Sequence, residues 1–362
     1  MTKISNKSID HKCPSCHAPL KFNPQSQNWI CEYCDSTFNL KDLKENTQKY
    51  QEHETTEESK IIEDNPDIGD YNIYRCPNCG AQIVTDQNTS ATFCVYCKNT
   101  AIIKERLVGK FEPKELIPFN KTIDDAKKAF KKVGRHHPLM PSSFSSPQNI
   151  SEIRGIYIPF WLFSSTTNGG ITTHCTKTRS WRSGDYVYTK TDIYSVVREG
   201  EITFVKVPND GSLKFDNAIM NSIEPFDYSK LVPFNPSYLS GFLSEKYDLE
   251  SDKVKEEVIS RMHNTVVEKL KKDIKGYNSC QVVSDNITFP NLNIEYVLLP
   301  VYLLNIKYKD KMYTFAMNGE SGKLIGNMPV DKQKAVLAFI LTFIITFLIT
   351  YAIFYLFIRS NV

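Results

Sequence analysis

The chain carries Cys13-Pro14-Ser15-Cys16 and, after an interval of 14 residues, Cys31-Glu32-Tyr33-Cys34. The same pattern returns 63 positions further on, as Cys76-Pro77-Asn78-Cys79 and Cys94-Val95-Tyr96-Cys97. A C-x-x-C pair on a tight turn presents two thiolates to one metal ion, and two such turns complete a tetrahedral site with four cysteine ligands. The spacing therefore predicts two zinc ribbons, at residues 11–40 and 73–105, each built around one structural Zn²⁺ ion.

Two other uses of paired cysteines fit the sequence less well. Disulfides need an oxidising compartment, and residues 1–10 are polar and lack the apolar core of a signal peptide. Redox C-x-x-C motifs usually occur singly, next to a βαβ pattern. Because four protein thiolates fill each predicted site, no position is left for a water or a substrate. We therefore expect zinc ions that stabilise small domains and do not catalyse.

A second strong feature is the uncharged apolar segment 335–358, which reads AVLAFILTFIITFLITYAIFYLFI. As a helix it would span about 36 Å at about 1.5 Å per residue, enough to cross a hydrocarbon core of about 30 Å. Tyr351 and Tyr355 lie toward its distal end, where amphipathic rings favour the membrane interface. A buried core helix is the alternative, but it is disfavoured by the uniform apolarity of all faces. The segment therefore predicts a single-pass transmembrane helix.

Flanking charges predict the orientation of this helix. Lys332 and Lys334 precede the segment and Arg359 follows it, so the positive-inside bias favours a cytoplasmic location for the N-terminal side. Zinc thiolates need a reducing compartment, which favours the same orientation. We expect a protein of the cell membrane whose bulk lies in the cytoplasm and whose last residues, 359–362, lie outside.

The composition indicates a modular chain of 362 residues with a formal net charge of +3. Residues 41–72 hold four lysines against ten acidic residues, which predicts a flexible acidic linker. We therefore expect the first ribbon to move independently and the second to dock on the main domain. Duplex-binding modules usually show a basic face, but the two ribbons carry net charges of only zero and +1. The charge distribution thus disfavours nucleic acid as a partner.

The main domain, residues 106–330, contains a faint duplication. Leu116-Ile117-Pro118-Phe119-Asn120 returns as Leu231-Val232-Pro233-Phe234-Asn235, and Ile158-Pro159-Phe160-Trp161-Leu162 resembles Leu299-Pro300-Val301-Tyr302-Leu303. An amphipathic helix follows each copy of the first motif. Thr122, with Asp125 three residues on, forms a capping-box pattern at the start of one helix, and the other is expected at 252–275. The pattern predicts two related halves, at about 106–210 and 225–330.

Runs of β-forming residues continue each half. Turn signals at 183–185 and 199–201 predict a meander in the first half, and those at 309–311, 318–319 and 321–322 predict one in the second. The predicted fold class is α+β. It combines two small four-cysteine zinc ribbons, a duplicated helix-plus-antiparallel-sheet domain and one C-terminal transmembrane helix.

Catalytic motifs are weak. Residues 319–323 read G-E-S-G-K, but they lack the spacing of a phosphate-binding loop and predict a turn. His174 and Cys175 are adjacent on a strand, so their side chains should point to opposite faces, and Cys280 is expected to be a lone thiol. The sequence predicts no catalytic residues, no cofactor other than zinc, and no enzymatic activity.

Several of these motifs together resemble a known family. They are the paired ribbons, the two proline-aromatic strands, the segment Ala316-Met317-Asn318-Gly319-Glu320-Ser321-Gly322-Lys323 and the terminal apolar helix. They are similar to Gram-positive bacterial membrane proteins described as TFIIB-type zinc ribbon-containing proteins, some of which are labelled as a primosomal helicase subunit. The resemblance covers most of the chain beyond the first ribbon, and many members have a single ribbon. The helicase label does not fit this chain, because its sequence holds no phosphate-binding motif.

The resemblance implies a membrane-bound adaptor, linked to envelope-stress systems of the phage-shock type in which an anchor recruits cytosolic scaffold proteins. Its expected partners are protein scaffolds or membrane-stress proteins, with membrane contact through 335–358. A second hypothesis is a nucleic-acid-binding or RNA-polymerase-associated zinc ribbon protein held at the membrane. A third is an enzyme whose site gathers Trp161, His174 and Arg179.

Overall fold

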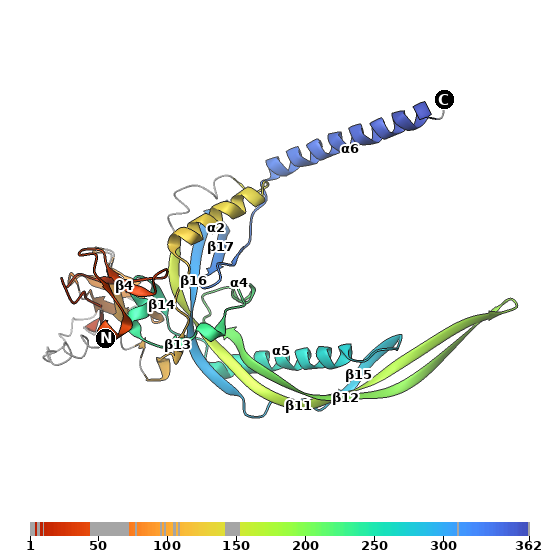
Figure 1. Cartoon of the computed structure of the whole chain (residues 1–362), viewed down its shortest axis with the longest axis horizontal. Helices are drawn as coiled ribbons and strands as arrows, with labels where there is room; N and C mark the ends of the chain where they lie inside the picture. Colours follow the sequence, from red (N-terminus) through yellow and green to blue (C-terminus); the bar gives the residue numbers. More distant parts are fainter. Residues whose placement is uncertain are drawn as a thin grey trace, which may run out of the picture.

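A computed structural model gives the fold of the chain (Figure 1). It describes residues 4–5, 8–9, 11–43, 72–76, 78–94, 96–97, 99–103, 106–107, 109–141, 153–309 and 311–360. Most of the expected acidic linker, residues 44–71, lies outside these ranges. The described chain combines helices and strands. The cysteine-rich segments lie at one end, a large sheet lies in the middle, and a long hairpin projects at the other end (Figure 1).

Small sheets form around the cysteines. The first is antiparallel and consists of β3 (Leu20–Asn23), β4 (Asn28–Cys31) and β5 (Thr37–Phe38). In the second, β6 (Asn72–Arg75) pairs with β7 (Gln82–Thr85) and with β1 (Ile4–Ser5). The second cysteine-rich segment continues into the large sheet through β8 (Thr89–Phe93) and β9 (Thr100–Ile103), and β9 pairs with β2 (Ser8–Ile9).

The large sheet joins strands from distant parts of the chain. Its order is β13 (Val232–Pro233), β10 (Glu115–Leu116), β16 (Asn293–Tyr308), β11 (Arg154–Ser183), β14 (Leu243–Glu245), β8, β9 and β2. Off this path, β12 (Tyr186–Asp210) and β15 (Ser279–Asp285) pair with β11, β17 (Lys311–Asn318) pairs with β16, and β18 (Leu324–Gly326) pairs with β17. The helices are α2 (Ile123–His136), α4 (Asn217–Ser222), α5 (Ser251–Lys272) and α6 (Lys332–Ser360). Short 3-10 helices are Gly109–Phe111, Tyr228–Lys230 and Pro236–Leu239.

The two pairs of similar motifs lie against each other in this sheet. Leu116 of the first copy is opposite Val232 of the second. Ile158 is opposite Leu299, which is its own counterpart in the other copy. Two related halves packed about a local twofold axis would give this register, although the duplication itself stays a prediction.

The main helices begin and pack largely as their sequences predict. The capping box at Thr122 is present, since its side chain accepts from Asp125 N–H and the Asp125 carboxylate accepts from Thr122 N–H. The expected apolar stripe of α5 is buried at Val254, Val258, Met262, Val266 and Leu270. The last two side chains pack against the hairpin β11–β12, so one face of α5 lies along the hairpin.

The hairpin itself corrects one sequence prediction. The chain reverses at 184–185, as expected, and Gly184 adopts a positive φ of 61°. The second turn, expected at 199–201, was wrong, because β12 runs straight through it and Gly200 pairs with Gly169. A Cβ atom at Gly200 would lie 3.6 Å from Leu270 Cδ2. Leu270 of α5 therefore packs over this glycine, with room for a Cβ atom in ordinary van der Waals contact.

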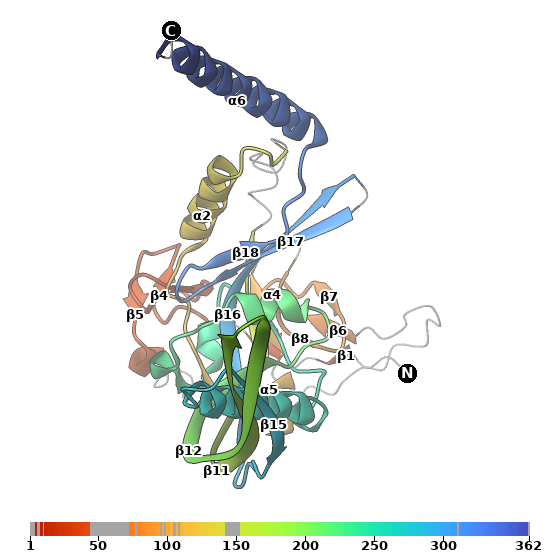
Figure 2. The ribbon, with the colours of Figure 1, turned by 90° about the vertical axis from the view of Figure 1, so that its right-hand side faces the viewer.

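Helix α6 is long and apolar enough to cross a membrane. Its apolar side chains point outward along its length, as at Phe339, Phe347 and Phe357. Two hydrogen bonds attach its start to the loop that follows α2: Asp331 N–H donates to Leu139 O at 2.8 Å, and Lys334 Nζ donates to Met140 O at 2.8 Å. Figure 2 accordingly shows α2 and the start of α6 at the same end of the body.

Candidate metal centres

The first four-cysteine group gathers around one point. Cys13 and Cys31 are buried, whereas Cys16 and Cys34 are exposed. The sulfur atoms of Cys13 and Cys34 lie 3.6 Å apart, and those of Cys16 and Cys31 lie 3.5 Å apart. All four sulfurs lie within 4.8 Å of one another. The sequence-predicted ligands are therefore brought together.

The second group repeats this geometry. Cys76 and Cys97 sulfurs are 3.6 Å apart, and Cys79 and Cys94 sulfurs are 3.7 Å apart. Cys76 and Cys94 are buried, Cys79 is exposed, and all four sulfurs again lie within 4.8 Å of one another. Two equivalent groups that could hold metal ions are therefore present.

The sulfur spacing fits a tetrahedral metal ion. With metal–sulfur bonds of about 2.3 Å, a tetrahedron of four thiolates has edges of about 3.8 Å. The four sulfur distances, between 3.5 and 3.7 Å, come close to that edge length. Each group could hold one ion with four protein ligands.

Backbone conformation explains how the C-x-x-C turns form. The residue that follows the second cysteine of a pair has a positive φ at His17, Asp35 and Gly80. This left-handed residue reverses the chain, so that the backbone N–H of Cys13 reaches Ala18 O and that of Cys76 reaches Ala81 O, at 2.7 and 2.8 Å. The shared alanine in the two motifs thus occupies the position that closes each turn.

The first ribbon is docked on the main domain, whereas the sequence predicted a ribbon that moves independently. Phe22 and Trp29 pack against Tyr238, with ring centroids 5.2 and 5.1 Å from it. Trp29 Nε1 donates to Ser237 O at 2.8 Å, and Phe22 N–H donates to Ser240 O at 3.0 Å. No local sequence signal connected these residues, which are about 210 positions apart.

The second ribbon is docked through strand pairing and charge. Its strand β8 pairs with β14, and Ser90 Oγ donates to Ser244 Oγ at 2.9 Å. Lys214 Nζ lies 2.7 Å from Asp86 and 2.8 Å from Glu245. Burial opposes ionisation of Asp86, but Lys214 and nearby backbone N–H groups outweigh it and hold the pKa of Asp86 well below its usual value. Asp86 is thus a charged link between the ribbon and the main domain.

Each centre leaves one tyrosine on the surface. Tyr33 and Tyr96, at equivalent positions inside the second cysteine pairs, are 84% and 75% exposed. Their neighbours in sequence, Cys34 and Cys97, belong to the two four-cysteine groups. Folding of each group therefore fixes the position of an aromatic side chain that the ribbon's own core does not use.

The turn at 318–323 is an internal packing element. Asn318 is buried, and its Oδ1 accepts from the backbone N–H groups of Glu320 and Ser321, both at 2.9 Å. Its Nδ2 donates to Ile223 O and Pro225 O, at 3.2 and 3.3 Å. The backbone N–H groups that a phosphate-binding loop would offer to a ligand are thus taken up inside the protein.

The three residues of the enzyme hypothesis lie at separate places. Trp161 is in the body, where its Nε1 donates to Leu249 O at 2.8 Å. His174 and Arg179 lie further out on the same strand, 13 and 18 residues beyond Trp161. At about 3.3 Å per residue, the nearer of them is roughly 40 Å away along the strand. The geometry does not gather them into one site.

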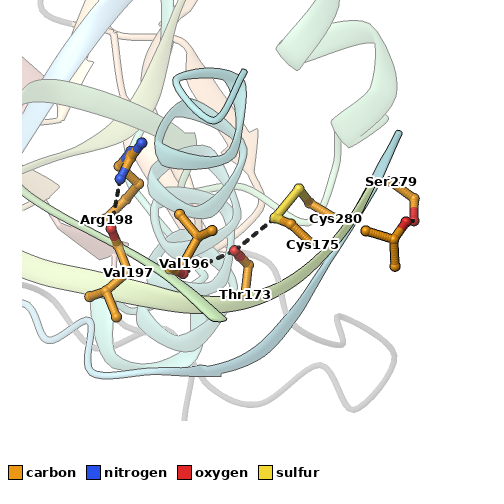
Figure 3. The surroundings of a disulfide bond; sticks show 8 residues. Thr173, Cys175, Val196, Val197, Arg198, Ser279 and Cys280 are labelled. Carbon is orange, nitrogen blue, oxygen red and sulfur yellow. Dashed lines mark hydrogen bonds between the residues drawn. A yellow bond between two sulfur atoms is a disulfide. The ribbon is translucent and has the colours of Figure 1, made fainter. Parts of the chain in front are cut away.

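Cys280 is not the lone thiol that the sequence predicted, because it forms a disulfide with Cys175 (Figure 3). The two residues face each other where β15 pairs with β11, with Cα atoms 4.1 Å apart. Cys175 is buried and His174 is exposed, so the expected alternation of this strand is confirmed. The pairing depends on the register of two strands 105 positions apart, which no local pattern reveals.

A half-buried carboxylate, that of Glu224, lies beside the 318–323 turn. Burial raises the pKa of Glu224 to about 7, against the opposing charges of Arg261 and Lys323, and nearby Asp210 adds to the rise. Within the described part of the chain, Glu224 Oε1 accepts no hydrogen bond. Burial also raises the pKa of Asp210 to about 6. Both groups resist ionisation because desolvation disfavours the charged form.

We expect the contribution of Glu224 to the free energy of unfolding to fall as the pH rises from about 5 to 8. The folded pKa of Glu224 lies above its ordinary value of 4.5, so its contribution is present below about 4.5 and is lost as the pH passes about 7. Because this carboxylate is partly solvated, the loss should be only about 1–2 kcal/mol. Glu224→Gln should remove this contribution, so that the free energy of unfolding falls less with pH than in the wild type, as measured by denaturant titrations at several pH values. Glu256→Gln, at an exposed position of α5, is the matched control, and equal slopes in Glu224→Gln and the wild type would contradict the argument.

Comparison with known proteins places the chain in a family. No protein-family model matches it, and no solved structure matches it. Among curated proteins it is similar to the uncharacterized protein YdjG of Bacillus subtilis (strain 168), with 31% identity over 333 residues, which cover 91% of this chain and 93% of the relative. The chain therefore belongs to the family of YdjG.

Proposed function

We propose that the chain is a membrane-anchored adaptor, whose two zinc ribbons bind protein partners in the cytoplasm. The observation that carries this proposal is the pair of exposed tyrosines, Tyr33 and Tyr96, each held beside a four-cysteine group with no open ligand position. Aromatic side chains on rigid supports are common anchors of protein interfaces. The ribbons lie at the end of the body remote from the hairpin tip (Figure 1).

Zinc is the metal that we propose for both groups. A closed tetrahedral set of four thiolates suits Zn²⁺, which would hold the ribbon folded and leave no site for a substrate. The resemblance to zinc ribbon-containing membrane proteins supports the same metal and suggests a role in envelope stress.

For the orientation, we propose that α6 spans the cell membrane once, with the ribbons on its cytoplasmic side. Lys332 and Lys334 support this arrangement. The Cys175–Cys280 disulfide weakens the argument from a reducing compartment, so the orientation depends on these flanking charges. Cleavage of an N-terminal tag by protease added outside intact spheroplasts would reject it.

The adaptor proposal predicts partner loss when both tyrosines are removed. We expect Tyr33→Ala with Tyr96→Ala to lower the recovery of the partner by roughly tenfold or more, as for loss of an interface hot spot. Recovery is measured by affinity purification from solubilised membranes, with and without nuclease, followed by mass spectrometry. Met312→Ala, which removes a 63% exposed side chain of β17 outside the ribbons, is the control.

Two outcomes separate the proposal from its alternative. Recovery of scaffold or membrane-stress proteins that resists nuclease and depends on the tyrosines supports the adaptor. Recovery of RNA polymerase or DNA-bound proteins that nuclease abolishes supports the nucleic-acid hypothesis instead.

A further inference from the structure

The outer part of the hairpin extends beyond its supports. β15 pairs with β11 only as far as Thr176, and α5 ends at Lys272. Among the residues that the structure describes, segment 177–192 therefore forms a two-stranded ribbon, in which β11 pairs with β12 and with no third strand. We call residues 177–192 together with 269–275, the adjoining end of α5, the distal arm. Lys177 connects its two parts, since its Nζ lies 5.2 Å from the ring centre of Tyr277, just after α5.

The distal arm concentrates the positive charge of the chain. Its basic side chains are all exposed: Lys177, Arg179, Arg182, Lys190, Lys269, Lys271, Lys272 and Lys275. Against these eight stand Asp185, Asp192 and Asp273, which leaves a net charge of +5. The whole chain has a net charge of +3, so the remainder carries −2. The arm is a basic extension of a slightly acidic body.

The tip of the arm adds exposed aromatic rings. Trp181, Tyr186 and Tyr188 are 51%, 72% and 48% exposed. Trp181 and Tyr188 face each other across the two strands, and their rings stack with centroids 5.8 Å apart. Rings of this kind favour the headgroup level of a bilayer, where basic side chains also find lipid phosphates. The tip therefore combines the two side-chain types that bind a lipid interface.

We propose that the distal arm docks on a bilayer surface that contains anionic phospholipid. Trp181 and Tyr188 would lie at the headgroup level, and the lysines at the end of α5 would face the lipid phosphates. The proposal rests on α6 as the membrane anchor, which is part of the proposed function. The arm and α6 project from the body toward the same side (Figure 1), so the anchor would bring the arm near the bilayer. Anchored at two places, the body would be held in a fixed orientation that directs the ribbons away from the membrane.

Trp181 makes this proposal testable in the full chain. The other two tryptophans, Trp29 and Trp161, are 1% and 9% exposed and lie in the body, so Trp181 is the tryptophan accessible to lipid. The protein is reconstituted in nanodiscs of phosphatidylcholine, with or without phosphatidylglycerol, in which the acyl chains carry bromine as a quencher. We expect emission to be quenched in the anionic discs and Trp181→Phe to abolish that quenching. Raising the salt from about 0.1 to 1 M shortens the screening length from about 10 to 3 Å and should also release the arm.

Charge variants on one helix give a matched comparison. Lys271→Gln with Lys272→Gln removes two charges from the arm and should shift the docking equilibrium by roughly tenfold or more. Lys253→Gln with Lys255→Gln removes two exposed charges from the other end of α5 and should leave the quenching unchanged.

Three results would overturn the proposal. One is Trp181 emission that bromine does not quench in either lipid, and another is equal quenching in both lipids. The third is binding of a labelled RNA oligonucleotide that depends on Lys271 and Lys272 without any lipid quenching, which would reassign the arm to nucleic acid. Co-elution of the protein with the discs reports insertion of α6 separately, so failure of the anchor and failure of the arm are distinguishable.

Discussion

Replacing Cys13 and Cys16 by serine is expected to unfold the first ribbon and, if both groups hold the zinc proposed for them, to reduce the metal content from two ions per chain to one. Small ribbons of this kind depend on metal binding, which supplies about 10–16 kcal/mol in comparable zinc modules. The effect should reach the main domain, because Trp29 is buried against Tyr238. Loss of the ribbon would expose both rings.

Three measurements check this expectation. Elemental analysis gives the zinc content, tryptophan emission should shift to the red as Trp29 meets water, and limited proteolysis should cut within residues 11–43. The protein should stay in the membrane fraction, because α6 is distant from the ribbon in the chain. Cys175→Ser with Cys280→Ser makes the same chemical change at the disulfide and should keep two zinc ions. A Cys13/Cys16 variant that keeps both ions and its emission spectrum would contradict the ribbon prediction.

Local patterns in the sequence predicted the features that depend on local spacing. The C-x-x-C pairs place their sulfurs together because each turn is fixed by residues that are adjacent in the chain. The stripe on α5 is buried because side chains three and four positions apart share one face of a helix. The apolar length of α6 follows directly from composition.

Contacts between distant segments could not be predicted in this way. The Cys175–Cys280 disulfide depends on which residues of β11 and β15 are opposite each other, and the docking of Trp29 depends on the position of Tyr238. Gly200 was taken for a turn, since glycine is common in turns and the approach of α5 leaves no mark in the neighbouring residues. A single sequence shows the periodicity of each helix and strand, but it does not show which distant segment packs against each face.

Phe119→Ala is expected to lower the free energy of unfolding of the main domain by about 3–5 kcal/mol, the range for a fully buried phenylalanine. Phe119 has no exposed surface, and its ring stacks on Phe242 at 4.1 Å and meets Tyr157 and Tyr302 edge to face. A Cβ atom on Gly319 would come within 2.6 Å of the same ring, so the ring packs directly against this glycine. Removing it should leave a cavity where several elements of the fold meet.

The related motif supplies the control. Phe234 is at the same position of the second L-[IV]-P-F-N motif, but it is only partly buried, so Phe234→Ala should cost less than half as much. Phe119→Leu, which fills most of the space, should fall between the wild type and Phe119→Ala. Denaturant unfolding in one detergent measures the free energy of unfolding of all three variants. The values are compared with the same slope of free energy against denaturant concentration. Equal losses of unfolding free energy in Phe119→Ala and Phe234→Ala would instead mean that the two phenylalanines contribute equally to stability, which would contradict the argument from the packing around Phe119.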